Sequence, residues 1–397
     1  MSQVPVILKP GREKSLKRLH PWVFSGAIAQ VQGEPRSGDT VLVKSAEGQA
    51  LALAAWSPQS QIRARVWTFD AQAQVNVAFF RNRLKSALAL RERLPAREHT
   101  NALRLVHGES DGLPGLIVDR YADVLVAQFL AAGTERWREA ILDALAELTG
   151  CEAIFERSDA DVRQLEGLPE RAGFVRGNAE ASRCAIREHG LSFRVDIAAG
   201  QKTGFFLDQR DNRQRIRALS QGRKVLDCFC YTGGFAISAA AGGASHVTAL
   251  DSSGPALAAA ADNARANGLG AERIAFEEAD VFQHLRTLRN AGARYDLIIL
   301  DPPKFAPTSG QAERAARAYK DINLLAFKLL APGGLLATFS CSGGVPAELF
   351  QKIVAGAALD AGISAKVVDR YTVAADHPVA LEFPEGDYLK GLLAYRP

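Results

Sequence analysis

The sequence predicts an α/β protein whose C-terminal half forms a parallel, doubly wound sheet. After residue 186, apolar runs of strand length alternate regularly with helical segments, which is typical of parallel strands joined by crossover helices. Residues 1–80 instead hold short apolar runs punctuated by glycines, which predict a small β barrel. Residues 81–185 mix helical and strand periodicities, so a small α+β domain is expected there. The predicted domains are therefore 1–80, 81–185 and 186–397.

The individual elements follow from the same patterns, in chain order. In the first domain we expect strands near residues 5–10, 22–31, 40–45, 51–57 and 62–69. In the second, helical spacing predicts helices over 77–94 and 134–148, the latter with Thr134 as its N-cap, and a hairpin that turns at Ala122 and Asp123. In the third, strands are expected over 223–229, 244–251, 273–280, 295–303, 333–342, 365–371 and 390–396.

The composition is that of an ordinary globular protein, with 47% hydrophobic and 23% charged residues in a chain of 397. No apolar run approaches the roughly 18 residues of a membrane span, and the N-terminal residues lack the apolar core of a secretory signal. Five scattered cysteines indicate free thiols in a reducing cytoplasm. The C-x-C spacing of Cys228 and Cys230 is not a zinc or iron–sulfur spacing, so no metal is expected.

The net charge of +4 is concentrated near the N-terminus, where residues 1–80 carry nine Lys/Arg against five Asp/Glu. A cluster of cations precedes Trp22 and Phe24. It consists of Lys9, Arg12, Lys14, Lys17, Arg18 and His20, of which Arg12, Lys14, Lys17 and Arg18 are the expected RNA contacts. Cations beside aromatic rings suit a polyanion whose bases can stack. Taken alone, however, the cluster favours a solvated surface next to an ordinary core tryptophan.

Three carboxylates stand at consecutive strand ends of the third domain. Asp227 ends the first strand. Asp251 follows 24 residues later, at the end of the second strand, where a carboxylate would accept hydrogen bonds from ribose hydroxyls. Asp280 ends the third strand, where it could accept a hydrogen bond from an adenine amino group. One such Asp is usually a cap or turn, but three together predict a nucleoside site. The ligand could be NAD or S-adenosylmethionine (SAM). The G-x-G-x-x-G fingerprint is absent, because Phe229 and Tyr231 replace the glycines, and this disfavours NAD.

Several motifs resemble known families. "VLDCFCYTGGF", "LDSS", "EEADVF", "DPPKF" and "FSCSG" are similar to the successive motifs of class I SAM-dependent methyltransferases. Upstream, "GREKSLKRLHPWVFSG", "GESDGLPGLIVDRY" and "KTGFFLDQRDNR" resemble the bacterial 23S (large-subunit) ribosomal RNA cytosine-5 methyltransferases. The resemblance extends from about Gly11 to Tyr395. It implies an N-terminal PUA RNA-binding domain, a central β-β-α-β-β domain and a Rossmann-like methyltransferase domain.

The resemblance also implies a cofactor, partners and site residues. The cofactor would be SAM, and the partner 23S rRNA or a large-subunit particle in the cytoplasm; a homodimer is left open. The cofactor-binding residues would be Asp227, Thr232, Gly233, Gly234, Asp251, Ser252, Asp280, Asp301, Pro302, Gln209 and Arg210, with Lys202 and Thr203 less firmly included.

Cys341, in "FSCSG" at the end of the fifth strand, is the candidate nucleophile. Carbon 5 of cytosine is a poor nucleophile, so direct methylation is slow. A thiolate that adds to C6 places electron density on C5 and divides one difficult step into easier ones. The other four cysteines lie in the cofactor loop or outside the third domain. The alternative for Cys341 is a small packed residue.

Asp301, in "DPPKF", is the candidate catalytic partner, since a carboxyl at the N3/N4 edge of cytosine can stabilise charge as the thiolate adds. Lys304 is expected to contact RNA or to be simply solvated. Better-known RNA cytosine-5 enzymes carry a second cysteine near this place, which this chain lacks. The group that removes the C5 proton therefore stays open, with Asp376 and His377 as weak candidates.

Three other functions compete with this interpretation. A related methyltransferase acting on a guanine nitrogen would share the "FLDQR" and "DPPKF" segments but would need no nucleophilic Cys341. A non-catalytic RNA-binding ribosome assembly factor would keep only the fold, although the full set of strand-end carboxylates argues against a decayed site. An NAD-dependent oxidoreductase ranks third.

Overall fold

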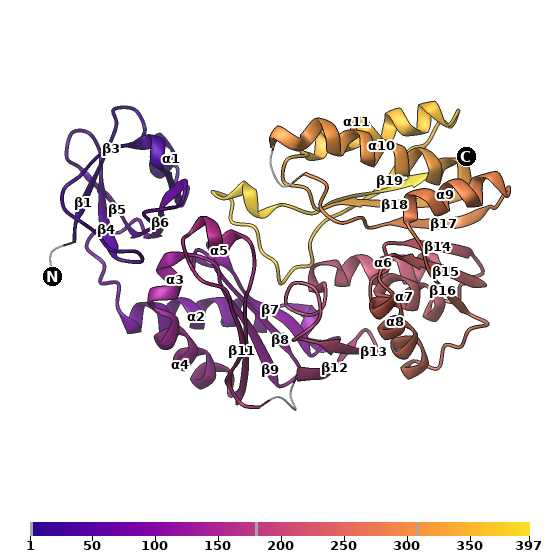
Figure 1. Cartoon of the computed structure of the whole chain (residues 1–397), viewed down its shortest axis with the longest axis horizontal. Coiled ribbons are helices and arrows are strands. Elements are labelled where there is room, and N and C mark those ends of the chain that lie inside the picture. Colours follow the sequence, from indigo (N-terminus) through magenta and orange to yellow (C-terminus); the bar gives the residue numbers. More distant parts are fainter. Residues whose placement is uncertain (1–2, 179–181, 307–308) are drawn as a thin grey trace. The chain divides into compact units, whose positions relative to one another are not determined.

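The computed structural model describes residues 3–178, 182–306 and 309–397. The chain folds into two compact units, and each unit is formed by three separate segments of the sequence (Figure 1). Unit 1 holds residues 1–188, 195–207 and 375–386, and unit 2 holds residues 189–194, 208–374 and 387–397. The backbone thus passes between the units after residues 188, 194, 207, 374 and 386.

The first sheet of unit 1 is formed by the glycine-punctuated N-terminal segment. Among the described residues it has six strands in the order β2-β6-β5-β4-β1-β3, antiparallel except for the β1–β4 pair. Val6, Val41 and Val66 belong to the apolar cluster that this sheet encloses. The elements are β1 Pro5–Leu8, α1 Lys14–Lys17, β2 Trp22–Phe24, β3 Ile28–Val31, β4 Thr40–Lys44, β5 Ala50–Trp56 and β6 Ile62–Thr68.

The second sheet of unit 1 has, in the described ranges, five strands in the order β11-β10-β9-β8-β7. Asn76 caps α2 by accepting from the Phe79 amide at 3.0 Å, and the predicted hairpin is confirmed, because β8 and β9 pair antiparallel. The elements are α2 Val77–Glu92, β7 Ala102–His107, β8 Leu116–Tyr121, β9 Val124–Phe129, α3 Ala132–Arg136, α4 Arg138–Thr149, β10 Ala153–Ser158, α5 Val162–Leu165, β11 Arg171–Arg176 and β12 Arg183–Glu188. Strand β13, Leu191–Asp196, spans the boundary between the units.

The expected N-cap at Thr134 is wrong. The predicted helix is divided into α3 and α4, and Thr134 lies inside α3 rather than before it. Its side chain is fully buried, and its hydroxyl donates to the Ala131 carbonyl at 3.0 Å. A threonine can satisfy its hydroxyl on a nearby backbone carbonyl as well as at a cap, so its residue type alone did not fix its position.

Unit 2 contains the doubly wound sheet. In the described residues its seven strands run in the order β16-β15-β14-β17-β18-β20-β19. Neighbours from β16 to β18 pair in parallel, as predicted, whereas β20 pairs antiparallel with both β18 and β19. The expected wholly parallel sheet is therefore a mixed sheet with one reversed strand near its edge. The strands are β14 Lys224–Cys228, β15 His246–Asp251, β16 Ile274–Glu278, β17 Tyr295–Leu300, β18 Leu330–Ser340, β19 Lys366–Tyr371 and β20 Lys390–Tyr395.

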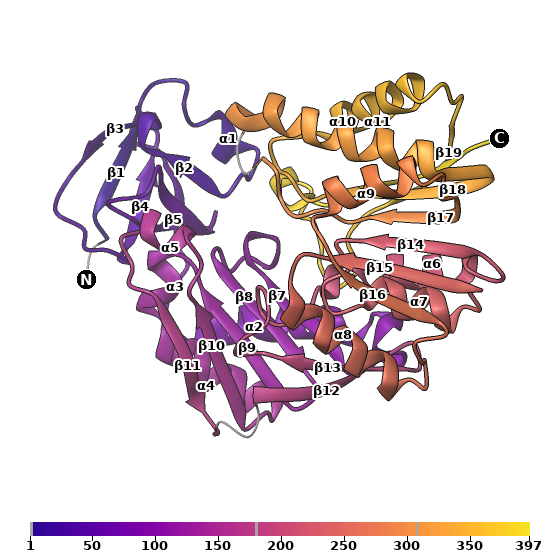
Figure 2. The same cartoon turned by 45° about the vertical axis from the view of Figure 1, so that its right-hand side comes forward.

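Helices cover both faces of this sheet (Figures 1 and 2). Helices α6, α7 and α8 lie on one face, and α9, α10 and α11 lie on the other. Ile298, Leu336 and Phe327 are fully buried in the cluster between the sheet and the second layer, which removes a large apolar area from water. The helices are α6 Arg210–Leu219, α7 Gly234–Ala241, α8 Gly254–Ala266, α9 Val281–Asn290, α10 Ala312–Leu329 and α11 Ala347–Asp360.

The contact between α6 and α7 depends on two glycines. A Cβ atom at Gly242, the C-cap of α7, would stand 2.1 Å from the Arg217 carbonyl oxygen of α6. At Gly234, the first residue of α7, it would stand 3.1 Å from the Arg213 side chain. Because the C-cap of α7 lies directly on the backbone of α6 and the first residue of α7 lies against the Arg213 side chain, the two helices pack closely.

We expect Gly242→Ala to destabilise unit 2 by about 2–3 kcal/mol, since an overpacked contact against backbone cannot relax cheaply. Gly356→Ala is the control, because a Cβ atom in that part of α11 would meet only the end of the Lys320 side chain at 3.6 Å. This control should be neutral or stabilise by up to about 1 kcal/mol through helix propensity. Urea unfolding measures both variants; equal stabilities would contradict the close contact.

Candidate active site

The predicted site residues of the third domain gather at the carboxyl edge of the sheet. Strands β16, β15, β14, β17 and β18 are neighbours, so their C-terminal ends lie side by side. Asp227 and Asp251 lie at or next to the ends of β14 and β15. Asp280, Asp301 and Cys341 follow β16, β17 and β18 within two residues. Such an edge is where open α/β sheets bind ligands.

The loop between β14 and α7 is tight. Phe229 and Tyr231 adopt positive φ angles of 64° and 49°, which non-glycine residues seldom do, and Gly233 follows with 82°. Left-handed residues of this kind concentrate at functional sites, where the surrounding fold holds them in place. The Cys230 amide donates to the Leu250 carbonyl at 3.0 Å, and the Gly233 amide to the Cys230 carbonyl at 2.8 Å. The loop therefore turns sharply without the glycines of a dinucleotide fingerprint.

Two of the strand-end carboxylates also have structural roles. Asp251 accepts from the Tyr231 amide at 2.8 Å with one oxygen and from the Ser253 amide at 2.9 Å with the other. It thereby joins the β14 loop to the start of α8, with exposed Ser252 between these contacts. Asp280 caps α9 by accepting from the Gln283 amide at 2.9 Å, and its side chain is exposed. Capping and ligand binding are compatible, because a carboxylate has further lone pairs.

Asp227 has no structural role of this kind. It is fully buried, and among the described residues neither carboxylate oxygen has a hydrogen bond of regular geometry, although the Ala236 amide lies close enough to lower its pKa. Burial raises its pKa well above the usual range, and the neighbouring Asp301 carboxyl raises it further. An unpartnered buried carboxyl costs free energy in the isolated protein. A ligand that brings positive charge or N–H donors to this edge of the sheet would remove that cost.

Asp301 has a pKa of about 7. Burial is the main cause, followed by the nearby Asp208 carboxyl, while a hydrogen bond from Gln209 and the charge of Arg213 act in the opposite direction. The Gln209 side-chain oxygen accepts from the Asn212 amide at 2.7 Å, which leaves its NH2 group to face Asp301. Gln209, assigned near the cofactor only by resemblance, thus lies beside a strand-end carboxyl.

The other residues of "KTGFFLDQRDNR" differ in position. Arg213, which the sequence did not single out, lies close to Gly234, and its positive charge lowers the pKa of Asp301. Arg210 is fully buried, with its Nε atom 3.5 Å from Asp211. Thr203 lies within unit 1, where its hydroxyl donates to Asp119 at 2.6 Å, and Lys202 precedes it with a positive φ of 57°. The pair with Asp119 gives Thr203 a structural role in unit 1.

A hydrogen-bond network surrounds Cys341. Ser340 donates to the Tyr319 hydroxyl at 2.9 Å, and the Ser342 hydroxyl lies 3.0 Å from the same oxygen. Ser342 also accepts from the amides of Phe305 and Ala306 at 3.1 and 3.0 Å. The two serines that flank Cys341 are therefore both held by Tyr319. The network also joins "FSCSG" to the end of "DPPKF".

Cys341 differs from the other cysteines in exposure. All five cysteines lie in the described ranges, and only Cys341 is not buried. Burial raises the pKa of Cys228 and Cys230 well above the usual thiol range and that of Cys184 to about 11. A buried, protonated thiol is a poor nucleophile. The structure thus places one accessible sulfur at the sheet edge.

The structure also locates the remaining site residues that the sequence suggested. Lys304 is exposed, whereas Pro302 beside it is buried. Asp376 and His377 lie in unit 1 and are almost fully buried. Asp376 accepts from the Arg104 amide at 2.9 Å, and its carbonyl accepts from Arg91 at 2.9 Å. These contacts account for Asp376 without a role in proton transfer.

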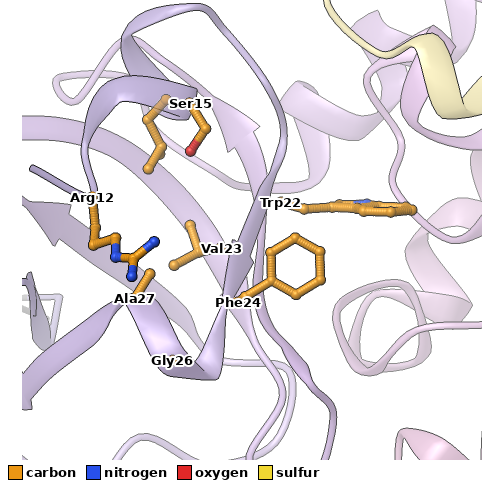
Figure 3. Close-up of a pocket in the computed structure, with 8 residues that line it drawn as sticks. Arg12, Ser15, Trp22, Val23, Phe24, Gly26 and Ala27 are labelled. Carbon is orange, nitrogen blue, oxygen red and sulfur yellow. The ribbon is translucent and has the colours of Figure 1, made fainter.

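One of the N-terminal cations, Arg12, lines a pocket in the first sheet of unit 1. Arg12, Lys14, Lys17 and Arg18 are exposed on α1 and its flanks. The pocket has a volume of about 370 Å³, and Arg12, Trp22 and Phe24 belong to its lining (Figure 3). Phe24 is 49% exposed and meets Trp22 edge to face at 6.2 Å. The Trp22 indole N–H donates to Glu109 at 2.8 Å, which fixes its ring.

No metal centre or membrane helix is found in the described parts of the chain. No group of three or more His, Cys, Asp and Glu side chains there could hold a metal ion. None of the helices there is long and apolar enough to cross a bilayer.

The raised pKa of Asp301 predicts a pH-dependent stability. Between the unfolded pKa near 3.8 and the folded pKa of about 7, the folded protein binds the extra proton, so stability falls as the pH rises. Asp301→Asn should therefore raise the unfolding free energy at pH 8 by on the order of 2 kcal/mol and change it little at pH 4. Asp280→Asn, which keeps an exposed cap, should change little at either pH. Urea unfolding of the cofactor-free proteins at both pH values measures these free energies. A difference between Asp301→Asn and wild type that does not change with pH would contradict the raised pKa of Asp301.

Comparison with known proteins supports a family assignment. Residues 104–394 match the sequence profile of a family described as S-adenosylmethionine-dependent methyltransferases, and residues 6–69 match that of a PUA-like domain. A solved structure from Streptococcus mutans, described as a SAM-dependent methyltransferase, superimposes with a TM-score of 0.85 at 22% identity, covering 99% of this chain and all of that one. A methyltransferase structure complexed with SAH also gives 0.85 at 22% identity over the full length of both chains. At this identity the structures show a shared fold.

Curated relatives are closer in sequence. A protein of Aeromonas hydrophila named ribosomal RNA large subunit methyltransferase I is 52% identical over 389 residues, which is 98% of both chains. Its namesake in Shewanella amazonensis is 50% identical over 391 residues, covering 98% of this chain and 99% of that one. The chain belongs to the SAM-dependent methyltransferase family, within the group named ribosomal RNA large subunit methyltransferase I, and it carries a PUA-like domain near its N-terminus.

Proposed function

We propose that this protein methylates C5 of a cytosine in large-subunit ribosomal RNA through a covalent bond between Cys341 and C6 of the base. The observation that carries the proposal is the position of Cys341. It is an accessible cysteine at the carboxyl edge of the sheet, held by Ser340 and Ser342 next to the Asp301 loop. The named relatives support ribosomal RNA of the large subunit as the substrate.

The residues at the sheet edge fit SAM. Asp227 offers an unpartnered buried carboxyl to a cofactor that carries positive charge on its ammonium and sulfonium groups. Asp251 and Asp280 would accept from ribose and adenine, and the loop of residues 232–234 brings backbone close to the ligand. Thr232, Gly233, Gly234, Ser252, Pro302, Gln209 and Arg210 complete the proposed lining. When bound, SAM supplies an electrophilic methyl group.

The chemistry then follows from the chain's own groups. The Cys341 thiolate forms a bond to C6, and the electron pair of the C5–C6 double bond moves to C5, which takes up the methyl group. Asp301, with a pKa of about 7, can donate a hydrogen bond to N3 or accept one from the amino group as charge develops. A base, to which no residue is assigned, takes the C5 proton; the C5–H electron pair restores the C5–C6 double bond, and the C6–S pair leaves with the thiolate, so the cysteine is regenerated.

The N-terminal domain is proposed to hold the RNA. Exposed Arg12, Lys14, Lys17 and Arg18 suit phosphates, and the pocket beside Trp22 and Phe24 suits an unpaired base. Lys304, exposed in the loop after β17, would contact RNA close to the target base. The target must leave its stack to reach a pocket of this kind.

Other expectations from the sequence stay predictions. They are the three domain boundaries, the cytoplasmic location and the homodimer. Methylation of a guanine nitrogen, which needs no thiol, and a non-catalytic assembly role are the outcomes that would replace the proposal. The accessible thiol favours cytosine over both.

Cys341→Ala should lower methyl transfer from labelled SAM to unmodified bacterial ribosomal RNA by about 10³-fold or more, as expected for loss of a nucleophile. SAM binding should persist, and the product of the wild type should be 5-methylcytidine by nucleoside analysis. Cys184→Ala, a buried cysteine of unit 1, is the matched control and should stay active. A methylguanosine product, or an active Cys341→Ala variant, would overturn the proposal.

The covalent step has a separate test. RNA that carries 5-fluorocytidine cannot lose a proton from C5 of the target, so the adduct should accumulate and survive denaturing electrophoresis. Wild type and Cys184→Ala should form this species, and Cys341→Ala should not. Absence of the adduct in an active wild type would exclude the covalent route.

Phe24→Ala should raise the KM for ribosomal RNA by about tenfold with little change in kcat, because stacking on one base contributes about 1–3 kcal/mol.

Arg12→Gln should lower the slope of log affinity against log salt by just under one unit, since one phosphate contact is lost. Arg36→Gln removes the same charge from an exposed site of the first sheet outside the pocket lining and should alter neither value. Equal effects of the two arginine variants would mean that RNA is attracted only by the overall positive charge of the domain, and would contradict a specific phosphate contact at Arg12.

A further inference from the structure

The reversed strand β20 brings a lysine to the cysteine segment. Since β20 runs antiparallel to β18, its first residue lies at the carboxyl edge, and Lys390 is the register partner of Ser340. The Lys390 ammonium donates to the Ser342 carbonyl at 2.8 Å. Lys390 thus contacts the chain on both sides of Cys341.

The Lys390 ammonium has little negative charge near it. Lys390 is partly buried, and in the described ranges its ammonium donates to a backbone carbonyl and forms no ion pair with a carboxylate. Burial lowers its pKa; the Cys341 thiol and then the Asp387 carboxyl act in the opposite direction, and Lys304 lowers it further. Tyr319, whose pKa is raised mainly by burial, lies close enough to Cys341 and to Asp301 for both to raise its pKa further.

We propose that Lys390 is a positioning residue that holds Cys341 as a thiolate through its adjacent ammonium group. This inference rests on the proposed role of Cys341 as the nucleophile. The thiol proton leaves to solvent, Lys390 stays protonated, and the resulting anion and the ammonium neutralise each other in a partly buried site. The same ammonium stabilises the thiolate when it is expelled from the methylated base. Lys304 is a poorer partner, because it is exposed on a loop.

The test is the pH profile of Cys341 alkylation by iodoacetamide, read by mass spectrometry of the Cys341 peptide in the full-length protein. The buried cysteines react slowly, and Cys341→Ser assigns the signal. Lys390→Met should move the midpoint upward by about one pH unit or more, a tenfold loss of thiolate at neutral pH. Lys390→Arg should restore it, and Lys304→Met, which removes a neighbouring charge, should move it much less.

Lys390→Gln separates charge from hydrogen bonding, since its amide can still donate to the Ser342 carbonyl. It should shift the midpoint as Lys390→Met does; thermal unfolding confirms that each variant is folded. An unchanged midpoint in folded Lys390→Gln, or an equal shift in Lys304→Met, would overturn the inference. The acid limb of the kcat/KM profile for methylation should move with the alkylation midpoint.

The failure of this inference and that of the proposed function are distinguishable. If Lys390 variants shift alkylation but Cys341→Ala still makes a methylated base, the coupling is real and the covalent mechanism is wrong. If the 5-fluorocytidine adduct forms but Lys390 variants leave alkylation unchanged, Cys341 is the nucleophile and its thiolate depends on other groups.

Discussion

The Ser342 hydroxyl is the contact on which the geometry of the sheet edge depends. It accepts from two successive amides, those of Phe305 and Ala306, and it lies within hydrogen-bond distance of the Tyr319 hydroxyl. One side chain therefore joins the loop after β17, the loop after β18 and helix α10. Loops are usually the most mobile parts of a fold. Here two of them are held together by a buried polar network, which is strong when every member is satisfied.

The same edge of the sheet is destabilised by its carboxylates. Asp227 is buried without a partner, and Asp301 lies close enough to raise its pKa. A protein selected only for stability would replace such a pair with neutral residues. Their presence is consistent with a site shaped for a cationic ligand, where stability is given up for binding. The loop with left-handed Phe229 and Tyr231 belongs to the same pattern, since strain is held where the ligand approaches.

The sequence predicted the parts of this site that depend on chain order. Parallel strands end at one edge, so Asp227, Asp251 and Asp280 could be brought together before any coordinates were known. The residues that it missed depend on tertiary contacts. Arg213 lies close to Gly234 because α6 packs directly on α7, and Lys390 reaches the Ser342 carbonyl next to Cys341 because β20 is reversed. Strand direction at a sheet edge is not encoded in the apolar pattern of the strand itself. Thr134 was misplaced for a related reason, since its hydroxyl had a backbone partner inside the helix.

The five passages of the backbone between the units have a consequence for modularity. Residues 375–386 belong to unit 1, although they come after almost all of unit 2, and β20 with Lys390 follows them directly. No single cut in the chain separates one complete unit from the other. Gene fusion or recombination could exchange the N-terminal sheet, which is continuous in sequence, but it could not exchange unit 1 as a block. Lys390 and the unit 1 segment that precedes it in the chain are therefore inherited together.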